Sequence, residues 1–277
     1  MAMGYDPAGF SVGLPRTPTL VTFTGAVGKA FNFPLRLIIA ACVRLRIHPN
    51  ILTFTGVLIN IWAGWHLAHG EFHTAFWIML GANIFDFIDG KVAMETGKMS
   101  KFGGFWDSVI DRFSDLALSV GLICLYSSLG RTDYVLITSI AMVFATMTSY
   151  TRARAESLIP RCKVGFMERP ERIVLFMIGA VTNRMAAVMW VIGVLSILAV
   201  ANRIYLTYLV LNRKPMPSRA GMTGFFNRAF FWTDERATLP YDLWVIAILA
   251  FVWLTPPDWL HDPTASGPGL IGLLLGR

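Results

Sequence analysis

The chain has 277 residues, of which 55% are hydrophobic and only 15% are charged. Soluble domains carry about a quarter charged residues, so this composition excludes the soluble classes of protein and predicts an integral membrane protein. The net charge of +7 does not indicate nucleic-acid binding here, because basic cytoplasmic loops that face anionic lipid account for it.

The N-terminal part of the chain is predicted to lie outside the membrane core. Residues 1–30 are rich in Gly, Pro and Thr and are expected to form a loose arm. Residues 31–48 are short, apolar and basic, a pattern typical of an amphipathic helix that lies in the membrane interface. In the sequence HPNILT that follows, Pro49 and Asn50 form a helix-start signal.

Six apolar segments follow, and they approach the roughly 20 residues that a transmembrane helix needs. They are residues 51–68, 74–94, 104–128, 134–156, 171–183 and 186–211. The short connections between them favour antiparallel neighbours. We therefore expect an all-α integral membrane protein with a six-transmembrane-helix bundle at residues 49–212.

A C-terminal extension occupies residues 213–277. Its apolar stretch, residues 243–254, is too short for a full span on its own, so we favour a re-entrant, interfacial or dimer-contact helix. A seventh, tilted span over residues 239–260 is the alternative.

Basic residues orient the predicted bundle. Most of the 24 Lys and Arg residues lie before residue 49 or within residues 91–101, 152–172 and 203–236. The positive-inside rule places these regions in the cytoplasm. The connection between the second and third segments is then cytoplasmic, on the side where nucleotides are found.

That connection is flanked by four aspartates at helical spacing, in the sequence DFIDGKVAMETGKMSKFGGFWDSVID. Asp86 and Asp89 are three residues apart, and Asp107 and Asp111 are four apart, so each pair shares one face of a helix. Acids at a membrane are costly and usually functional. Because no Lys or Arg lies between the two acids of either pair, the acids are expected to need cations between them, and oxygen ligands suit Mg²⁺ or Mn²⁺.

The spacing D-x2-D-G-x2-A followed by G-x3-D-x3-D includes Gly90, Ala93 and Gly103. It resembles the signature of the CDP-alcohol phosphotransferase family, and the resemblance covers roughly residues 45–212. One position departs from the signature, because Met94 stands where the family usually has Arg. All four acids are unaffected by this difference.

The resemblance implies that a substituted phosphoryl group moves from a CDP-linked donor to an alcohol, with release of CMP, in a homodimeric enzyme. It implies two Mg²⁺ or Mn²⁺ ions on Asp86, Asp89, Asp107 and Asp111, with Asp111 also the general base toward the acceptor hydroxyl. Positioning and charge stabilisation dominate phosphoryl transfer, and paired metal ions provide both. The resemblance assigns donor contacts to Pro49, Asn50, Thr53, Asp86, Gly90, Ala93, Gly97, Ser100 and Gly103.

Two later sequences, SYTRARAES and VGFMERPERIV, resemble the bacterial phosphatidylinositol-phosphate synthases within the family. This resemblance assigns binding of the acceptor phosphate to Arg152, Arg172 and Arg203, with Arg169 as a substitute for Arg172. Three guanidinium groups at the cytoplasmic ends of apolar helices are also suited to a dianion. Ordinary positive-inside anchors are the alternative.

The predicted reaction joins CDP-diacylglycerol and inositol 1-phosphate to give phosphatidylinositol phosphate and CMP, in the cytoplasmic membrane with the active site facing the cytoplasm. Other acceptors stay open: glycerol 3-phosphate, free inositol or an inositol-bearing sphingolipid precursor. CDP-inositol and an ether-lipid CDP are alternative donors, and a transporter or lipid-binding scaffold without catalysis is a different class. Arg152, Arg172 and Arg203 favour a phosphorylated acceptor, because a neutral polyol would leave their charges without a partner.

Several other polar residues receive structural interpretations. Asp115 continues the helical face of the aspartates and is expected to pair with Arg112 or an incoming basic residue, not with a metal ion. His66, His69 and His73 are expected to anchor a turn at the opposite membrane interface. The three cysteines are expected to be packing residues without a disulfide.

Overall fold

The computed structural model describes residues 36–162, 164–215 and 239–265, and the regular structure in these residues is entirely helical. A short helix at residues 36–44 comes first. Eight labelled helices follow it in the described residues: α2 (Pro49–Ala68), α3 (Phe72–Glu95), α4 (Lys101–Ser128), α5 (Thr132–Glu156), α6 (Arg169–Thr182), α7 (Met185–Leu211), α9 (Leu239–Leu254) and α10 (Pro257–Leu260). The predicted all-α fold is confirmed for these residues. The predicted N-terminal arm lies outside them, as do residues 31–35 of the predicted interfacial helix and 216–238 and 266–277 of the extension.

Local sequence explains where the helices begin. Pro49 occupies the first position of α2, where a missing N–H costs nothing, and the His48 ring accepts a hydrogen bond from the Asn50 N–H at 3.2 Å. At the start of α4, the Ser100 hydroxyl accepts a hydrogen bond from the Gly103 N–H at 2.9 Å. The two capped ends lie beside the acidic motif and fix the backbone there.

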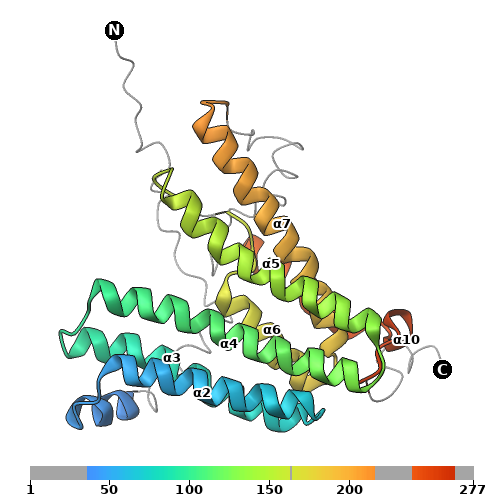
Figure 1. Ribbon diagram of the computed structural model, residues 1–277, viewed down its shortest axis with the longest axis horizontal. Coiled ribbons are helices and arrows are strands. Elements are labelled where there is room, and N and C mark those ends of the chain that lie inside the picture. Colours follow the sequence, from blue (N-terminus) through green and yellow to red (C-terminus); the bar gives the residue numbers. More distant parts are fainter. Residues whose placement is uncertain (1–35, 163, 216–238, 266–277) are drawn as a thin grey trace.

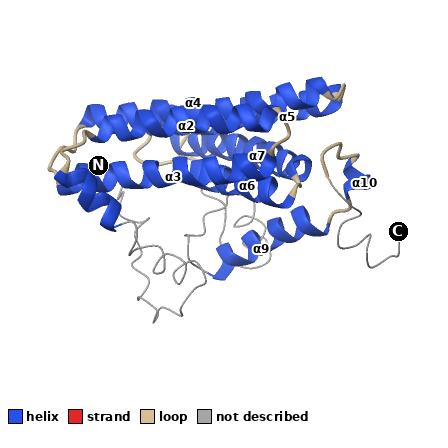
Figure 2. Ribbon diagram, turned by 90° about the horizontal axis from the view of Figure 1, so that it is seen from below, coloured by secondary structure: helices blue, strands red, loops and turns tan. Residues whose placement is uncertain are grey.

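The helices form two groups joined by α6 and by the contact of α4 with α5 (Figure 1). Helix α2 packs along both α3 and α4, while α5 packs along α7 and reaches the first group through α4. Helix α6 contacts both α3 and α7, so it lies between the two groups. Helix α9 contacts α7 and lies on the side of the bundle away from α4 (Figure 2).

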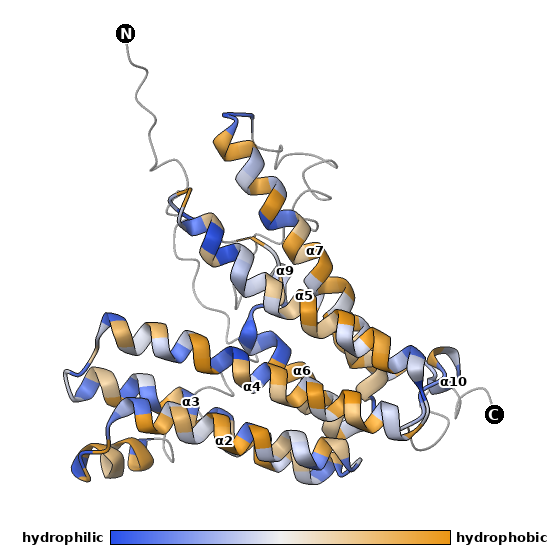
Figure 3. Cartoon of the chain, viewed as in Figure 1, coloured by the Kyte–Doolittle hydropathy of each residue, from blue (hydrophilic) through white to orange (hydrophobic). Residues whose placement is uncertain are grey.

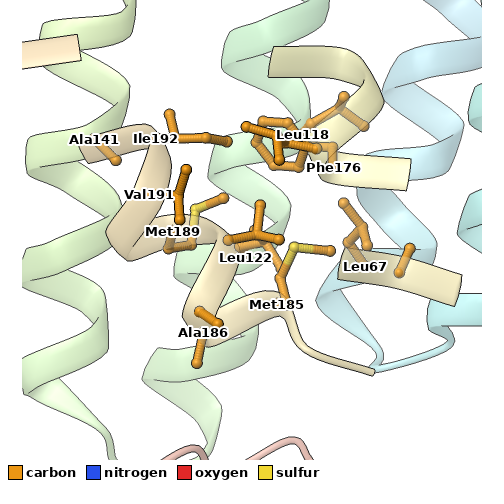
Figure 4. Close-up of a cluster of buried hydrophobic side chains, with 14 of the residues drawn as sticks. Leu67, Leu118, Leu122, Ala141, Phe176, Met185, Ala186, Met189, Val191 and Ile192 are labelled. Carbon is orange, nitrogen blue, oxygen red and sulfur yellow. The ribbon is translucent and has the colours of Figure 1, made fainter. Parts of the chain in front are cut away.

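The core runs through both groups. Figure 4 shows buried side chains from α2, α4, α5, α6 and α7 that meet near the middle of the bundle, among them Leu67, Leu118, Leu122, Ala141, Phe176, Met185, Met189 and Ile192. A second, smaller cluster packs Ile39 and Cys42 of the helix at 36–44 on Leu52, Ile88 and Val92. The cysteines at 42, 124 and 162 are free, as expected.

Three of the described helices, α2, α5 and α7, are long and apolar enough to cross a membrane. Helices α3 and α4 carry the acidic motif, and α6 has only 14 residues. Figure 3 shows hydrophobic residues along most of the helices and a hydrophilic first turn of α6. In the extension, α9 has 16 residues, and its apolar part, Tyr241–Leu254, is shorter than a membrane-spanning helix.

Two glycines allow the closest approach of α2 and α4. A Cβ atom placed on Gly121 would lie 2.1 Å from the carbonyl oxygen of Gly64, and one on Gly64 would lie 2.6 Å from the carbonyl oxygen of Ala117. Both neighbours are backbone atoms, which cannot rotate away. Small residues of this kind let membrane helices approach closely, and here they set the spacing of the helices that carry the motif residues.

We predict that Gly121→Ala lowers the midpoint of thermal unfolding in detergent, because overpacking of this kind costs about 1–3 kcal/mol or more. Gly81→Ala is the matched control, since a Cβ atom at Gly81 would meet no heavy atom within 4 Å. Equal unfolding midpoints for the two variants would contradict the backbone contact.

Candidate active site

Three of the four motif aspartates meet at one point between α3 and α4. Asp86, Asp89 and Asp107 each offer one carboxylate oxygen, and these oxygens lie within 4.8 Å of one another. In the described part of the chain this is the only such group of His, Cys, Asp and Glu side chains, so the three histidines at 66, 69 and 73 do not form one. An all-oxygen donor set at this spacing fits a hard divalent cation.

The HPNILT segment contacts the acidic group directly. The Thr53 hydroxyl donates a hydrogen bond to the Asp89 carboxylate at 2.5 Å, and both residues are buried. A Cβ atom at Gly103 would lie 3.2 Å from the Ser100 hydroxyl and 3.7 Å from the Asn50 side-chain oxygen. The structure therefore brings the predicted donor-binding residues of α2 and of the α4 N-terminus together.

The backbone beside this group is open where the sequence predicts nucleotide contact. A Cβ atom at Gly90 or at Gly97 would meet no heavy atom within 4 Å, and Gly97 has a φ of +65°, in the left-handed region that favours glycine. Ala93 is partly buried, whereas Met94, at the position where the motif usually has Arg, is 51% exposed.

An arginine from α6 lies between the acids. Arg169 donates a hydrogen bond through Nη1 to Asp86 at 2.7 Å, and its Nη2 is 3.1 Å from an oxygen of Asp111. This basic partner comes from a helix far along the chain, so the local spacing of the motif could not indicate it. Asp111, the predicted fourth ligand, is joined to this arginine and is not a member of the compact group.

Arg172 makes a second, more deeply buried ion pair. Its Nε and Nη2 both donate to one oxygen of Asp115, at 3.1 and 2.5 Å. Its Nη1 donates to the Thr148 hydroxyl at 3.2 Å and to the carbonyl of Met167 at 2.8 Å. Arg172 is only 2% exposed, so the protein itself uses most of its donors. The expected pairing of Asp115 with an incoming basic residue is confirmed.

The other two predicted acceptor arginines lie around the same turn of α5. Arg203, also 2% exposed, donates through Nε to the Val164 carbonyl at 3.0 Å and through Nη1 to the Thr148 carbonyl. Arg152, one turn after Thr148, is more exposed and donates to Glu168 at 2.6 Å. Arg172 of α6 and Arg203 of α7 thus meet at Thr148 of α5. Arg152 lies one turn after Thr148 on α5.

Sequence patterns did not reveal two of these features. The contact of Arg169 with the acids could only be suspected from the ERPER sequence, in which Arg169 and Arg172 share a helix face. Thr148 carries no signal in the sequence, because threonines in apolar helices are common and usually bond to their own backbone.

The buried pair of Arg172 and Asp115 gives a prediction about stability. Arg172→Met should destabilise the protein by about 3–5 kcal/mol, because it leaves a buried carboxylate unpaired, whereas Arg172→Met with Asp115→Leu should recover much of that loss. Denaturant unfolding in detergent measures both, with Arg154→Met on the exposed end of α5 as control. The pair assignment fails if the double variant is as unstable as the single one.

Known proteins resemble the chain over this same region. The family model of CDP-alcohol phosphatidyltransferases matches residues 46–210. The archaetidylinositol phosphate synthase of Pyrococcus horikoshii is 35% identical over 62% of this chain and 89% of its own length. The phosphatidylinositol phosphate synthase of Mycobacteroides abscessus is 31% identical over 60% of this chain and 80% of its own.

Solved structures agree with the sequence relatives. The crystal structure of Mycobacterium tuberculosis phosphatidylinositol phosphate synthase with CDP-DAG bound has a TM-score of 0.59 and 26% identity, and it covers 63% of this chain and 93% of that one. The structure of the same enzyme with manganese and citrate has a TM-score of 0.59 and 25% identity, over 67% and 96%. The acidic group, the helical fold and these matches together place the chain in the CDP-alcohol phosphatidyltransferase family of membrane enzymes.

Proposed function

We propose that the chain transfers a phosphatidyl group from CDP-diacylglycerol to inositol 1-phosphate, which gives phosphatidylinositol phosphate and CMP. The observation that carries this proposal is that Arg172 and Arg203 both bond to Thr148, with Arg152 one turn further along α5, while Arg172 also pairs with Asp115 on the helix that carries Asp107. The names of the relatives support it, since the archaeal enzyme is an archaetidylinositol phosphate synthase and the bacterial enzyme is a phosphatidylinositol phosphate synthase.

The acidic group would hold the divalent cations. Asp86, Asp89 and Asp107 are the proposed ligands, with Asp111 as the fourth, and two Mg²⁺ or Mn²⁺ ions are proposed. Bound divalent cations would stabilise the charge that develops on the pyrophosphate. The manganese in the mycobacterial structure supports a divalent cation at this site. Thr53 holds the Asp89 carboxylate in one orientation through its short hydrogen bond.

Asp111 is the proposed general base. The acceptor hydroxyl would attack the phosphorus that carries the diacylglycerol, and its proton would pass to the Asp111 carboxylate. The bond from that phosphorus to the CMP oxygen breaks, and CMP leaves. The donor nucleotide would lie along Gly90, Ala93 and Gly97, where the backbone is open, with Asn50, Ser100 and Gly103 at one end.

The acceptor phosphate would bind beside Thr148. Arg152 and Arg203 supply the charges that can face it, and within the described residues the Nη2 of Arg203 makes no hydrogen bond. Arg172 has five N–H groups and commits four of them to Asp115, Thr148 and Met167. We therefore propose that Arg172 offers the phosphate one N–H and mainly holds Thr148 in place.

The membrane arrangement extends this proposal. We propose that α2 to α7 all span the membrane within a catalytic domain at residues 49–212, with the acidic group on the cytoplasmic side. The helix at 36–44 would lie in the interface, since it buries Ile39 and Cys42 and exposes Leu37 and Ile38. A homodimer in the cytoplasmic membrane is proposed from the family resemblance.

The reaction is tested by CMP release from purified protein with Mg²⁺ and CDP-diacylglycerol. Inositol 1-phosphate, free inositol and glycerol 3-phosphate are supplied in parallel. We expect release with inositol 1-phosphate alone, because the arginines favour a phosphorylated acceptor over free inositol and the named relatives make inositol phospholipids. Release with another acceptor would keep the aspartate mechanism and reject the assigned acceptor.

Substitution of the base separates an enzyme from a non-catalytic lipid transporter or scaffold. Asp111→Asn should lower turnover by about 10²-fold or more, because the amide cannot accept the proton, while the unfolding midpoint stays close to that of the unchanged protein. Asp133→Asn, in the exposed first turn of α5, is the control and should keep full turnover. Full CMP release by Asp111→Asn would reject the proposed base.

A further inference from the structure

Arg169 bridges two motif aspartates that belong to different helices. Its Nη1 is hydrogen-bonded to Asp86 of α3, and its Nη2 forms an ion pair with Asp111 of α4. The arginine side chain is 16% exposed, and the two carboxylates are 30% and 19% exposed. A cation from α6 therefore partly neutralises the acidic site and connects three helices.

Some polar atoms of this Arg169 bridge lack a hydrogen-bond partner among the described residues. The Nε of Arg169 is buried without a hydrogen-bond partner among the described residues, and so is the Asp111 oxygen that faces Nη2. Arg172, one turn later, differs in this respect, because it has four internal hydrogen bonds. Buried donors and acceptors without partners cost free energy. Arg169 is thus held mainly by charge and is the less firmly fixed of the two arginines.

Asp111 has two competing uses in this arrangement. While Arg169 holds it, Asp111 stays outside the compact group of Asp86, Asp89 and Asp107. Asp86 belongs to both sets, since it contacts Arg169 and also supplies an oxygen to the group. A guanidinium and a divalent cation that share carboxylate oxygens weaken each other's binding.

We propose that Arg169 is a resident counter-cation that clamps Asp86 and Asp111, and that this clamp opens when a divalent cation binds. The inference rests on the metal-binding role proposed above for the aspartates. Arg169 would keep the carboxylates from repelling one another in the metal-free enzyme, at the cost of weaker metal binding. It is a positioning residue, and opening its clamp would free Asp111 to serve as a ligand and base.

The test is a titration of the full-length protein with Mn²⁺, without donor or acceptor, in which free Mn²⁺ is followed by electron paramagnetic resonance. Arg169→Gln removes both the charge and the clamp. Arg169→Lys keeps the charge, but an ammonium group cannot bridge two carboxylates as a planar guanidinium does. Arg154→Gln removes a positive charge at the exposed end of α5 and is the control for overall charge.

The expected result is that both Arg169 variants bind Mn²⁺ about tenfold more tightly than the unchanged protein, within the usual range of coupling between sites. Arg154→Gln should not change the affinity. Unchanged affinity in Arg169→Lys would show that only charge matters, and weaker binding in both variants would show that Arg169 supports the metal site. Either outcome overturns the clamp.

Two further measurements keep this inference separate from the proposed function. Asp89→Asn should weaken Mn²⁺ binding in any case, and if it does not, the metal-binding role itself is wrong. If Asp89→Asn weakens binding while Arg169→Lys behaves like the unchanged protein, only the clamp is rejected. Thermal unfolding of each variant in detergent shows whether an altered affinity comes from a folded protein.

Discussion

The repulsion among four carboxylates held inside an apolar bundle is the constraint on which the rest of this structure depends. Charges removed from water are costly unless partners or cations offset them. The chain places these carboxylates on two neighbouring helices, α3 and α4, both of which pack on α2. The Gly64–Gly121 contact brings α2 against α4 at backbone distance and so fixes where the acids of α4 can lie.

Helix α6 supplies the opposite charge in register with α4. Arg169 and Arg172 are three residues apart and contact Asp111 and Asp115, which are four residues apart. Successive turns of the two helices thus form two ion pairs. The first is partly exposed and borders the proposed metal site, while the second is buried and continues through Thr148 to Arg203. The position of α6 therefore links the acidic group to the arginines on the acceptor side.

This linkage explains why neighbouring arginines of one short sequence differ in role. Arg172 is surrounded by acceptors on three sides and behaves as part of the framework. Arg169 has a buried Nε without a described partner and touches carboxylates that a divalent cation would also use. In a low-dielectric interior, a charged side chain whose donors are nearly all hydrogen-bonded, such as Arg172, is held more firmly than one with an unpartnered donor, such as Arg169.

The sequence alone determined the helices and the residues of the acidic motif. Apolar length and capping residues predicted α2 to α7 to within three residues at each end, because these signals act within one segment. Spacing likewise predicted which acids share a helix face. Only the tertiary structure decided which helix supplies their basic partners, that Asp111 pairs with Arg169, and that Arg172 and Arg203 meet at Thr148. Spacing constrains neighbours on one helix, whereas contacts between helices depend on how they pack, and packing is set by the whole bundle.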